Sequence, residues 1–240
     1  NVKLDLTYFS FLFDTLNVHQ GERDKMSKLK EIHDYLISLG KKEKELNELD
    51  KSSIYLSMEI MEFAHRNQKR ENGEDYANHP SRCLQNYQNL VGIASHNHFC
   101  VDKDLMFKNG VPYDGVQEVC LLHDVIEDGG LTLDEIEEIF VECELGDYFR
   151  IYIKSALNNI THDKNIDYSS YIDICMENPI SALCKMMDLQ DNIYVLSLIK
   201  FDKKNYIRAE NYLRYLFLIN QKYQFIENSQ KNREKFKKEE

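Results

Sequence analysis

Tryptophan is absent from the 240 residues, and proline and glycine are scarce, with three and nine copies. Because tight turns favour these two residues, their scarcity leaves few positions for hairpin turns and favours helices. A long apolar run is also missing, so the sequence offers no membrane-spanning helix. Its start lacks the basic-then-apolar pattern of a signal peptide. We therefore expect a cytoplasmic protein.

Paired cysteines and an excess of positive charge are missing as well. The six cysteines contain no Cys-x-x-Cys motif, and Cys120 and Cys184 lie in apolar runs, a pattern typical of reduced core thiols. The formal net charge of −11 argues against broad binding to nucleic acid or to an anionic membrane, so we expect neither partner. A polyanionic substrate would need a metal and a few local cations to hold it.

Apolar residues are plentiful, at 42% of the chain with 15 tyrosines and 12 phenylalanines, which is enough for a sizeable core. They recur every three or four positions, without strand-like alternation, so we predict an all-α fold. The predicted helices cover residues 4–16, 25–39, 52–65, 80–94, 115–128, 132–143, 147–160, 179–199 and 203–225. We expect a helical extension at 1–49 packed on one domain at 50–225, and a polar tail at 226–240.

Helix boundaries in this prediction follow from capping chemistry. Thr132 and Glu135 have the spacing of a capping box, Asn178-Pro179 suits a helix start, and Asp202 suits an N-cap. The charged residues 41–50 indicate a solvated connection, and residues 95–113 a looped insertion. On the last helix we expect four residues to face the core, namely Tyr212, Leu213, Leu216 and Phe217.

The most informative stretch runs from Leu121 to Gly130 and carries His123, Asp124, Glu127 and Asp128. Side chains three or four positions apart share a helix face, so a neutral nitrogen ligand and three carboxylates gather within about one and a half turns. Three acids near a helix C-terminus oppose the helix dipole, a cost that a divalent cation would offset. The alternative is an ordinary acidic helix end.

Two further candidate ligands lie elsewhere in the sequence. His79 precedes Pro80 at a helix start, and Asp188 interrupts an apolar helix, where a carboxylate should be paired or bound to a metal. Alone, His79 could serve as a helix-start residue bonded to backbone, and Asp188 could form a salt bridge to Lys185. Together with His123-Asp124 they form the ordered pattern His…His-Asp…Asp, whose nitrogen and oxygen ligands suit manganese, iron or magnesium.

Three segments in this order resemble the HD superfamily of metal-dependent phosphohydrolases. They are Ala64–Pro80, Leu121–Asp128 and Lys185–Asn192. Within the superfamily, the sequence is most similar to the (p)ppGpp hydrolase domain of the RelA/SpoT enzymes and its stand-alone metazoan homologue. The resemblance covers roughly residues 50 to 215 and implies an all-helical HD domain with a metal site between helices.

The resemblance also implies a role for each matching residue. One manganese ion, or Mg²⁺, Fe²⁺ or Zn²⁺ in its place, would be held by His79, His123, Asp124 and Asp188. Glu127 and Asp128 would act on the attacking water and the pyrophosphate. The nucleotide would be bound by Arg70, Tyr76, Lys164 and Asn192. The implied reaction is removal of the 3′-pyrophosphate from a guanosine polyphosphate such as ppGpp.

Several positions depart from the family pattern around the nucleotide. They are Glu71, Asp75, Leu189 and His162, where the family usually has a basic residue, proline, arginine and lysine. Two alternatives therefore stay open, namely phosphohydrolysis of another nucleotide or a dinucleotide cofactor, and nucleotide binding without catalysis. Glu127 and Asp128 weigh against the second. We leave three other histidines outside the metal site, with His162 at the surface or pocket rim and His96 and His98 in the insertion.

Overall fold

The computed structural model describes residues 27–92, 113–200 and 202–231 of the chain. Within these ranges the protein is all-α, as predicted, with no strand and only an isolated antiparallel bridge between Lys69 and Asp75. The predicted helix at 4–16 and nearly all of the 95–113 insertion lie outside the described residues. Among the described helices, none has both the length and the apolar character to cross a bilayer.

The helices follow one another without long breaks inside the described ranges. In chain order they are α2 (Lys28–Ser38), α3 (Glu43–Leu49), α4 (Ser53–Ala64), α5 (Asn78–Val91), α7 (Val116–Leu122), α8 (Leu133–Glu142), α9 (Gly146–Tyr148), a π-helical turn η1 (Phe149–Ile153), α10 (Lys154–Ile160), α11 (Tyr168–Cys175), α12 (Pro179–Leu198) and α13 (Lys203–Tyr223).

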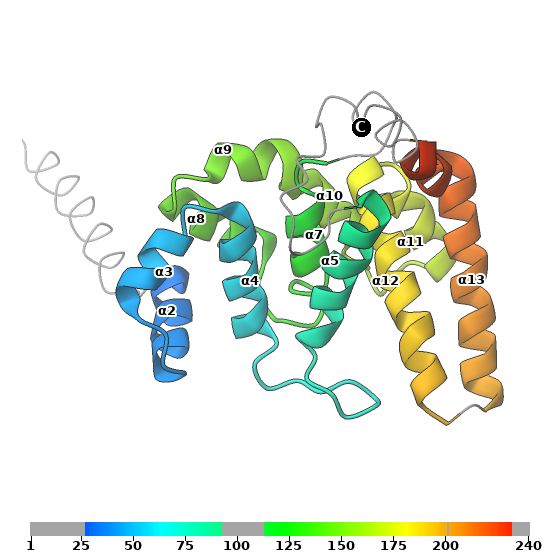
Figure 1. Cartoon of the computed structure of the whole chain (residues 1–240), viewed down its shortest axis with the longest axis horizontal. Coiled ribbons are helices and arrows are strands. Elements are labelled where there is room, and N and C mark those ends of the chain that lie inside the picture. Colours follow the sequence, from blue (N-terminus) through cyan, green and yellow to red (C-terminus); the bar gives the residue numbers. More distant parts are fainter. Residues whose placement is uncertain (1–26, 93–112, 201, 232–240) are drawn as a thin grey trace, which may run out of the picture.

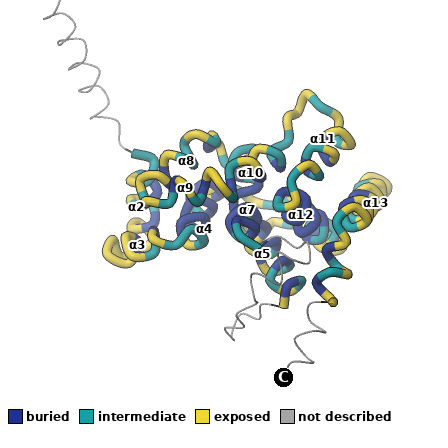
Figure 2. Tube along the Cα trace, turned by 90° about the horizontal axis from the view of Figure 1, so that it is seen from above, coloured by how far each residue is buried: buried dark blue, intermediate teal, exposed yellow. Residues whose placement is uncertain are grey.

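The centre of the bundle is formed by α7 and α12, which are the most continuously buried helices in Figure 2. α12 packs against α5, α7, α10 and α13, while α4 packs on α7. Figure 1 shows α2 and α3 on one side of this centre and α13 on the other. The elements that carry the predicted ligands, α5, α7 and α12, are therefore direct neighbours in the core.

The capping predictions at Thr132, Asn178 and Asp202 are confirmed. Thr132 Oγ1 accepts a hydrogen bond from the amide of Glu135, whose side chain in turn accepts from the amide of Thr132. Asn178 caps α12 with Pro179 in its first turn, and Asp202 Oδ1 accepts from the amide of Asn205 at the start of α13. These caps satisfy amides that a helix start leaves without partners, which is why such sequence patterns are reliable.

The helix predicted over 115–128 is shorter than expected, because α7 ends at Leu122. Turns follow, held by a bond from the Asp128 amide to the Asp124 carbonyl at 2.9 Å. Gly130 has a φ of +76°, which suits glycine. A side chain at Gly129 would lie 2.8 Å from Ala64 Cβ, so this segment packs closely against the end of α4.

Other differences concern segments that were predicted as loops or as core faces. Residues 41–50 contain the helix α3, which is anchored by the fully buried Leu46. Helix α11 was not anticipated. On α13, Leu213 and Phe217 are 55% and 66% exposed, whereas Tyr215 and Ile219 are buried. Tyr212 and Leu216 are half-buried and pack against the core, as predicted, but Leu213 and Phe217 do not. The covered face of α13, which packs against α12 and against Tyr168 of α11, contains Tyr215 in their place.

The chain continues as helix over residues 225–231. Phe225 in this segment is fully buried, and Ser229 Oγ donates a hydrogen bond to the carbonyl of Leu90 on α5. Four of the cysteines are buried as free thiols and Cys143 is half-buried, while Cys100 lies outside the described residues.

Candidate metal centre

Four side chains from three separate elements converge in the core. His79 lies in the first turn of α5, where Pro80 is tolerated because no amide donor is needed there. His123 and Asp124 follow the last residue of α7, and Asp188 lies in the middle of α12. His79, His123 and Asp188 are all less than 5% exposed. The fold therefore gathers all four predicted ligands at one point.

The facing atoms of these side chains are close to one another. His79 Nε2 lies 3.2 Å from His123 Nε2, 3.1 Å from Asp188 Oδ1 and 3.4 Å from Asp124 Oδ2. His123 Nε2 lies 3.2 Å from Asp124 Oδ2 and 3.8 Å from Asp188 Oδ1. Donor atoms bound at roughly 2.0–2.2 Å to one ion are about 3.0–3.5 Å apart, so the spacing suits a shared cation.

Both histidines are oriented by an acceptor at their other ring nitrogen. His79 Nδ1 lies 2.6 Å from Asp191 Oδ2, and His123 Nδ1 lies 2.9 Å from the Cys120 carbonyl. An N–H at each Nδ1 leaves the lone pair of each Nε2 directed at the common centre. Two such lone pairs 3.2 Å apart repel one another, and either a cation between them or a proton on one of them removes that repulsion. The surrounding carboxylates raise the pKa of His79, which favours the proton when no cation is bound. His79, His123 and Asp188 are thus able to hold a metal ion.

The carboxylate behind His79 is itself held in place. Arg82, one turn along α5, donates to both oxygens of Asp191 at 2.5 and 3.1 Å and to both oxygens of Glu74 at 2.8 and 2.6 Å. Burial alone would raise the pKa of Asp191, but the hydrogen bonds from His79 and Arg82 lower it. Asp191 therefore stays charged and keeps the His79 ring in its orientation.

Asp188 combines the two roles considered for it in the sequence. Its Oδ2 forms the ion pair with Lys185 at 2.7 Å, whereas its Oδ1 faces His79. Burial would raise the pKa of Asp188, but Lys185 and His79 bring it below its ordinary value, so the group is a carboxylate. The salt bridge and the metal ligand are therefore compatible, because they use different oxygens.

Cys83 also lies near the centre but on the outer side of His79. Its Sγ is 3.8 Å from His79 Nδ1, the nitrogen already occupied by Asp191, rather than from Nε2. Its Sγ still lies within 4.8 Å of ligand atoms of His79, His123 and Asp188. Cys83 and Asp124 are therefore the two candidates for the fourth position, and Asp124 is the one predicted from the sequence.

Glu127 and Asp128 lie in the turn that follows the ligands. The hydroxyl of Tyr76 is 2.8 Å from Asp124 Oδ2 and 3.0 Å from Asp128 Oδ2; with one proton, it donates to one carboxylate at a time. Glu127 is half-buried, and its Oε2 accepts from the His162 amide at 3.4 Å. Burial, followed by the charges of Asp124 and Asp128, raises the pKa of Glu127.

A pocket of about 290 Å³ opens beside the centre. Its wall includes Lys69, Arg70, Glu71, Tyr76, Asn192 and Arg208. Arg70 Nη2 donates to Asn192 Oδ1 at 2.7 Å, and Asn192 Nδ2 donates to Asp188 Oδ1 at 2.6 Å. The guanidinium of Arg70 also lies over the Tyr76 ring, 5.4 Å from its centroid. Arg70, Tyr76 and Asn192, three of the four residues predicted to bind the nucleotide, thus belong to one wall.

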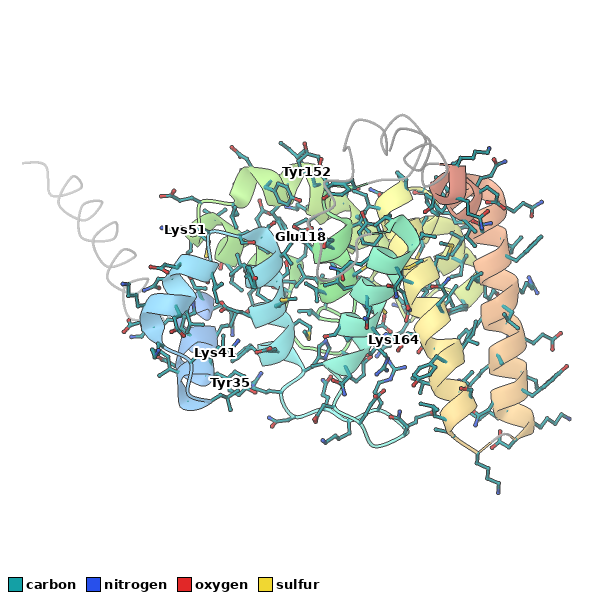
Figure 3. The ribbon with its side chains drawn as sticks, in the orientation of Figure 1. Tyr35, Lys41, Lys51, Glu118, Tyr152 and Lys164 are labelled. Atoms are coloured by element: carbon teal, nitrogen blue, oxygen red, sulfur yellow. The ribbon has the colours of Figure 1, made fainter. Side chains whose placement is uncertain are left out.

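Lys164, in contrast, lies in the loop between α10 and α11 with an exposed side chain (Figure 3), and it forms no hydrogen bond or ion pair with the other predicted site residues. His162 is close to the site through its amide, and its ring packs 4.4 Å from that of Tyr171, which agrees with a position at the rim. His96 and His98 lie outside the described residues.

Two supporting residues, Asp191 and Arg208, were missed in the sequence, and Arg82, a weaker candidate for binding the substrate, instead binds Asp191 and Glu74. Asp191 is three positions from Asp188, and Arg82 is three from His79, so helical spacing could have indicated both once the ligands were proposed. Arg208 lies on α13 and donates to Glu71 Oε2 at 2.8 Å, a contact across 137 residues that no local pattern reveals. No protein-family model matches the chain, so membership of the HD superfamily stays a prediction.

Proposed function

We propose that the protein is a metal-dependent phosphohydrolase of nucleotides. The observation that carries this proposal is the convergence of His79, His123, Asp124 and Asp188, with the Nε2 atoms of both histidines directed at one centre. Two features support catalysis over simple binding. Further carboxylates, Glu127 and Asp128, lie next to the ligands, and a pocket lined by cations adjoins them.

The four residues would hold a divalent ion through two nitrogens and at least two oxygens. Such an ion supplies Lewis-acid charge at a phosphoryl oxygen and lowers the pKa of water. Asp191 and the Cys120 carbonyl keep the imidazoles in the tautomer that binds, and Lys185 balances part of the charge of Asp188. Tyr76 restrains the Asp124 carboxylate from the pocket side.

Proton transfer is assigned to Glu127 and Asp128, the two carboxylates that are not proposed as metal ligands. We assign Glu127 as the group that accepts the proton of the attacking water, because its raised pKa brings it closer to neutral pH. Asp128, exposed and within hydrogen-bond distance of Tyr76, is placed to orient the water or to protonate the leaving oxygen. Both roles are part of the proposal.

The substrate we propose is a guanosine polyphosphate with a 3′-pyrophosphate, of the ppGpp type. Lys69, Arg70 and Arg208 bring positive charge to the pocket despite the net charge of the chain, and Tyr76 offers an aromatic ring. One observation favours the alternative of another nucleotide or a dinucleotide cofactor. Glu71 forms an ion pair with Arg208, so less positive charge is available to bind a polyphosphate.

The proposal is tested by incubating the full chain with a panel of nucleotides that includes ppGpp, GTP, GDP and NADP⁺, with Mn²⁺ or with a chelator. We expect Mn²⁺-dependent release of pyrophosphate from ppGpp, its loss in Asp188→Asn, and no change in Glu138→Gln, an exposed control on α8. Release of phosphate from a different nucleotide only would favour the alternative substrate. Binding without release from any nucleotide would overturn the assignment as an enzyme.

A further inference from the structure

A second group of ligand-type side chains lies away from the centre described above. His33 belongs to α2, Asp50 is the C-cap of α3, and Glu59 belongs to α4. His33 Nε2 is 3.1 Å from Asp50 Oδ2 and 3.9 Å from Glu59 Oε2, and one donor atom from each residue lies within 4.8 Å of the others. Three helical elements thus direct one nitrogen and two carboxyl groups at one point.

Glu59 is the unusual member of this group. It is 2% exposed, and its carboxyl oxygens accept no hydrogen bond from an N–H or O–H donor, so that its polar neighbours are the Asp50 carboxyl and His33 Nε2, which is 3.9 Å away. Buried carboxyl groups are normally hydrogen-bonded, paired or bound to a metal, because their desolvation is otherwise uncompensated. Burial, followed by the neighbouring Asp50 carboxyl, raises the pKa of Glu59 to about 8. Packing alone therefore gives no reason for a carboxyl group at this position.

The nearest basic side chain does not neutralise the group. Lys41, in the connection between α2 and α3 (Figure 3), pairs with Glu62 at 3.2 Å instead. Cys143, the C-cap of α8, is half-buried. Burial raises the pKa of its thiol, and the nearby charges of Asp50 and Glu59 also raise this pKa. His33 and Asp50 keep 12% and 10% of their side chains exposed, so an ion has a path from solvent.

We propose that His33, Asp50 and Glu59 form a second site for a divalent cation of the zinc class. One imidazole and two carboxylates with a remaining open position are a ligand set that zinc accepts, and four-coordinate bonds of about 2.0–2.1 Å place ligand atoms roughly 3.4 Å apart. The ion would join α2 and the end of α3 to α4. This site is independent of the function proposed above.

The competing explanation is a proton in place of the cation, held between Glu59 and Asp50. The substitution Glu59→Gln separates the two explanations, because glutamine reproduces the shape of a neutral glutamic acid but is a poor metal ligand. With a bound cation, the variant loses the ion. With a shared proton, it binds as many ions as the parent.

The experiment counts zinc ions per chain after chelator treatment, incubation with ZnCl₂ and dialysis, by mass spectrometry of the metal. The parent should bind two zinc ions, Glu59→Gln one, His123→Ala one, and the double variant none. Glu62→Gln removes an exposed charge from the same helix and should keep both ions. If Glu59→Gln matches the parent, the second site does not exist. The loss of one zinc ion in His123→Ala reports on the first site, and the loss of one zinc ion in Glu59→Gln reports on the second.

A thermal measurement in the His123→Ala background provides an independent test. Zinc should raise the melting temperature of this variant, because an ion that binds the folded chain stabilises it by mass action. Adding Glu59→Gln should weaken zinc binding by more than about 100-fold. Removing a residue that only supports a ligand lowers metal affinity by about 10–100-fold, and removing a ligand itself should lower it further. His33→Asn should have the same effect and replaces Glu59→Gln if that variant does not fold. An unchanged zinc-dependent shift in both variants would overturn the proposal.

Discussion

Asp191 illustrates how much of the centre depends on a residue that does not face it. Its carboxylate accepts from His79 Nδ1 and from Arg82, and it is 1% exposed. It lies on the same helix as Asp188, so α12 supplies both a ligand and the support for a ligand on α5. The orientation of His79 is thus set by two helices at once.

Replacing Asp191 should therefore weaken metal binding without removing any ligand. We expect Asp191→Asn to lower the affinity for Mn²⁺ by about 10–100-fold, because the amide cannot hold the Nδ1–H as a carboxylate does. The measurement is a calorimetric titration with MnCl₂. Glu74→Gln, which removes the other carboxylate bound to Arg82, serves as the control and should change the affinity far less.

Glu127 and Asp128 should affect rate rather than metal content. Glu127→Gln and Asp128→Asn keep the side-chain shape and remove the charge, so each should retain the ion and lose about 10²–10⁴ in kcat. Asp124→Asn should instead lower the metal content itself. Turnover within about threefold of the parent in either of the first two variants, far below the usual contribution of an acid or base, would mean that its catalytic role is wrong.

The pair formed by Glu71 and Arg208 should govern affinity for polyphosphates. The bond from Arg208 lowers the pKa of Glu71, which keeps the pair ionised. Glu71→Gln frees the guanidinium and should lower KM for ppGpp, whereas Arg70→Ala and Arg208→Ala should raise KM more than they lower kcat. Steady-state kinetics with ppGpp measure all three. An unchanged KM in Glu71→Gln would favour a substrate with fewer phosphates.

At the scale of single elements, the starts of helices were predicted better than their ends. Thr132, Asn178 and Asp202 cap their helices as expected because each cap depends on a few neighbouring residues. α7 ends at Leu122, six residues before the predicted end, and the following turns bring Gly129 close to Ala64, a contact between distant segments that no local pattern indicates. The four ligands were predictable as a pattern, whereas Arg208 was not, because its role exists only across the folded pocket.

The junction of α4 and α7 contains a buried carboxyl group that should respond to pH. Glu118, near the middle of the molecule in Figure 3, is 2% exposed and accepts hydrogen bonds from Ser53 and Tyr148. Burial raises the pKa of Glu118 above that of the unfolded chain. The folded protein therefore retains this proton at a pH where the unfolded chain has released it.

The free energy of unfolding should thus fall as pH rises above the unfolded pKa of about 4.5, by at most about 1.4 kcal/mol per pH unit for one proton. This contribution is complete below that pKa and is lost as pH rises through the raised value of the folded state. Glu118→Gln mimics the neutral form, so urea unfolding between pH 5 and 8 should show a smaller decline than in the parent. Glu138→Gln, exposed on α8, should leave the decline unchanged.

At the scale of the whole molecule, α4 separates two groups of ligand-type side chains. The centre built from α5, α7 and α12 lies on one side, and His33, Asp50 and Glu59 lie on the other, where α2 packs against α4. The all-α fold followed from the spacing of apolar residues alone. The second group could not be predicted, because Asp50 and His33 meet only when α3 folds back from α2.

The contact between His79 and Asp191 spans 112 positions of the chain, and that between Tyr76 and Asp124 spans 48. Individual helices form within about a microsecond, whereas closing such long segments is opposed by chain entropy. We therefore expect α5, α7 and α12 to exist before the centre does during refolding. Substitutions at the centre should then accelerate unfolding in stopped-flow experiments and leave the refolding rate nearly unchanged, and a cation that binds there would slow unfolding.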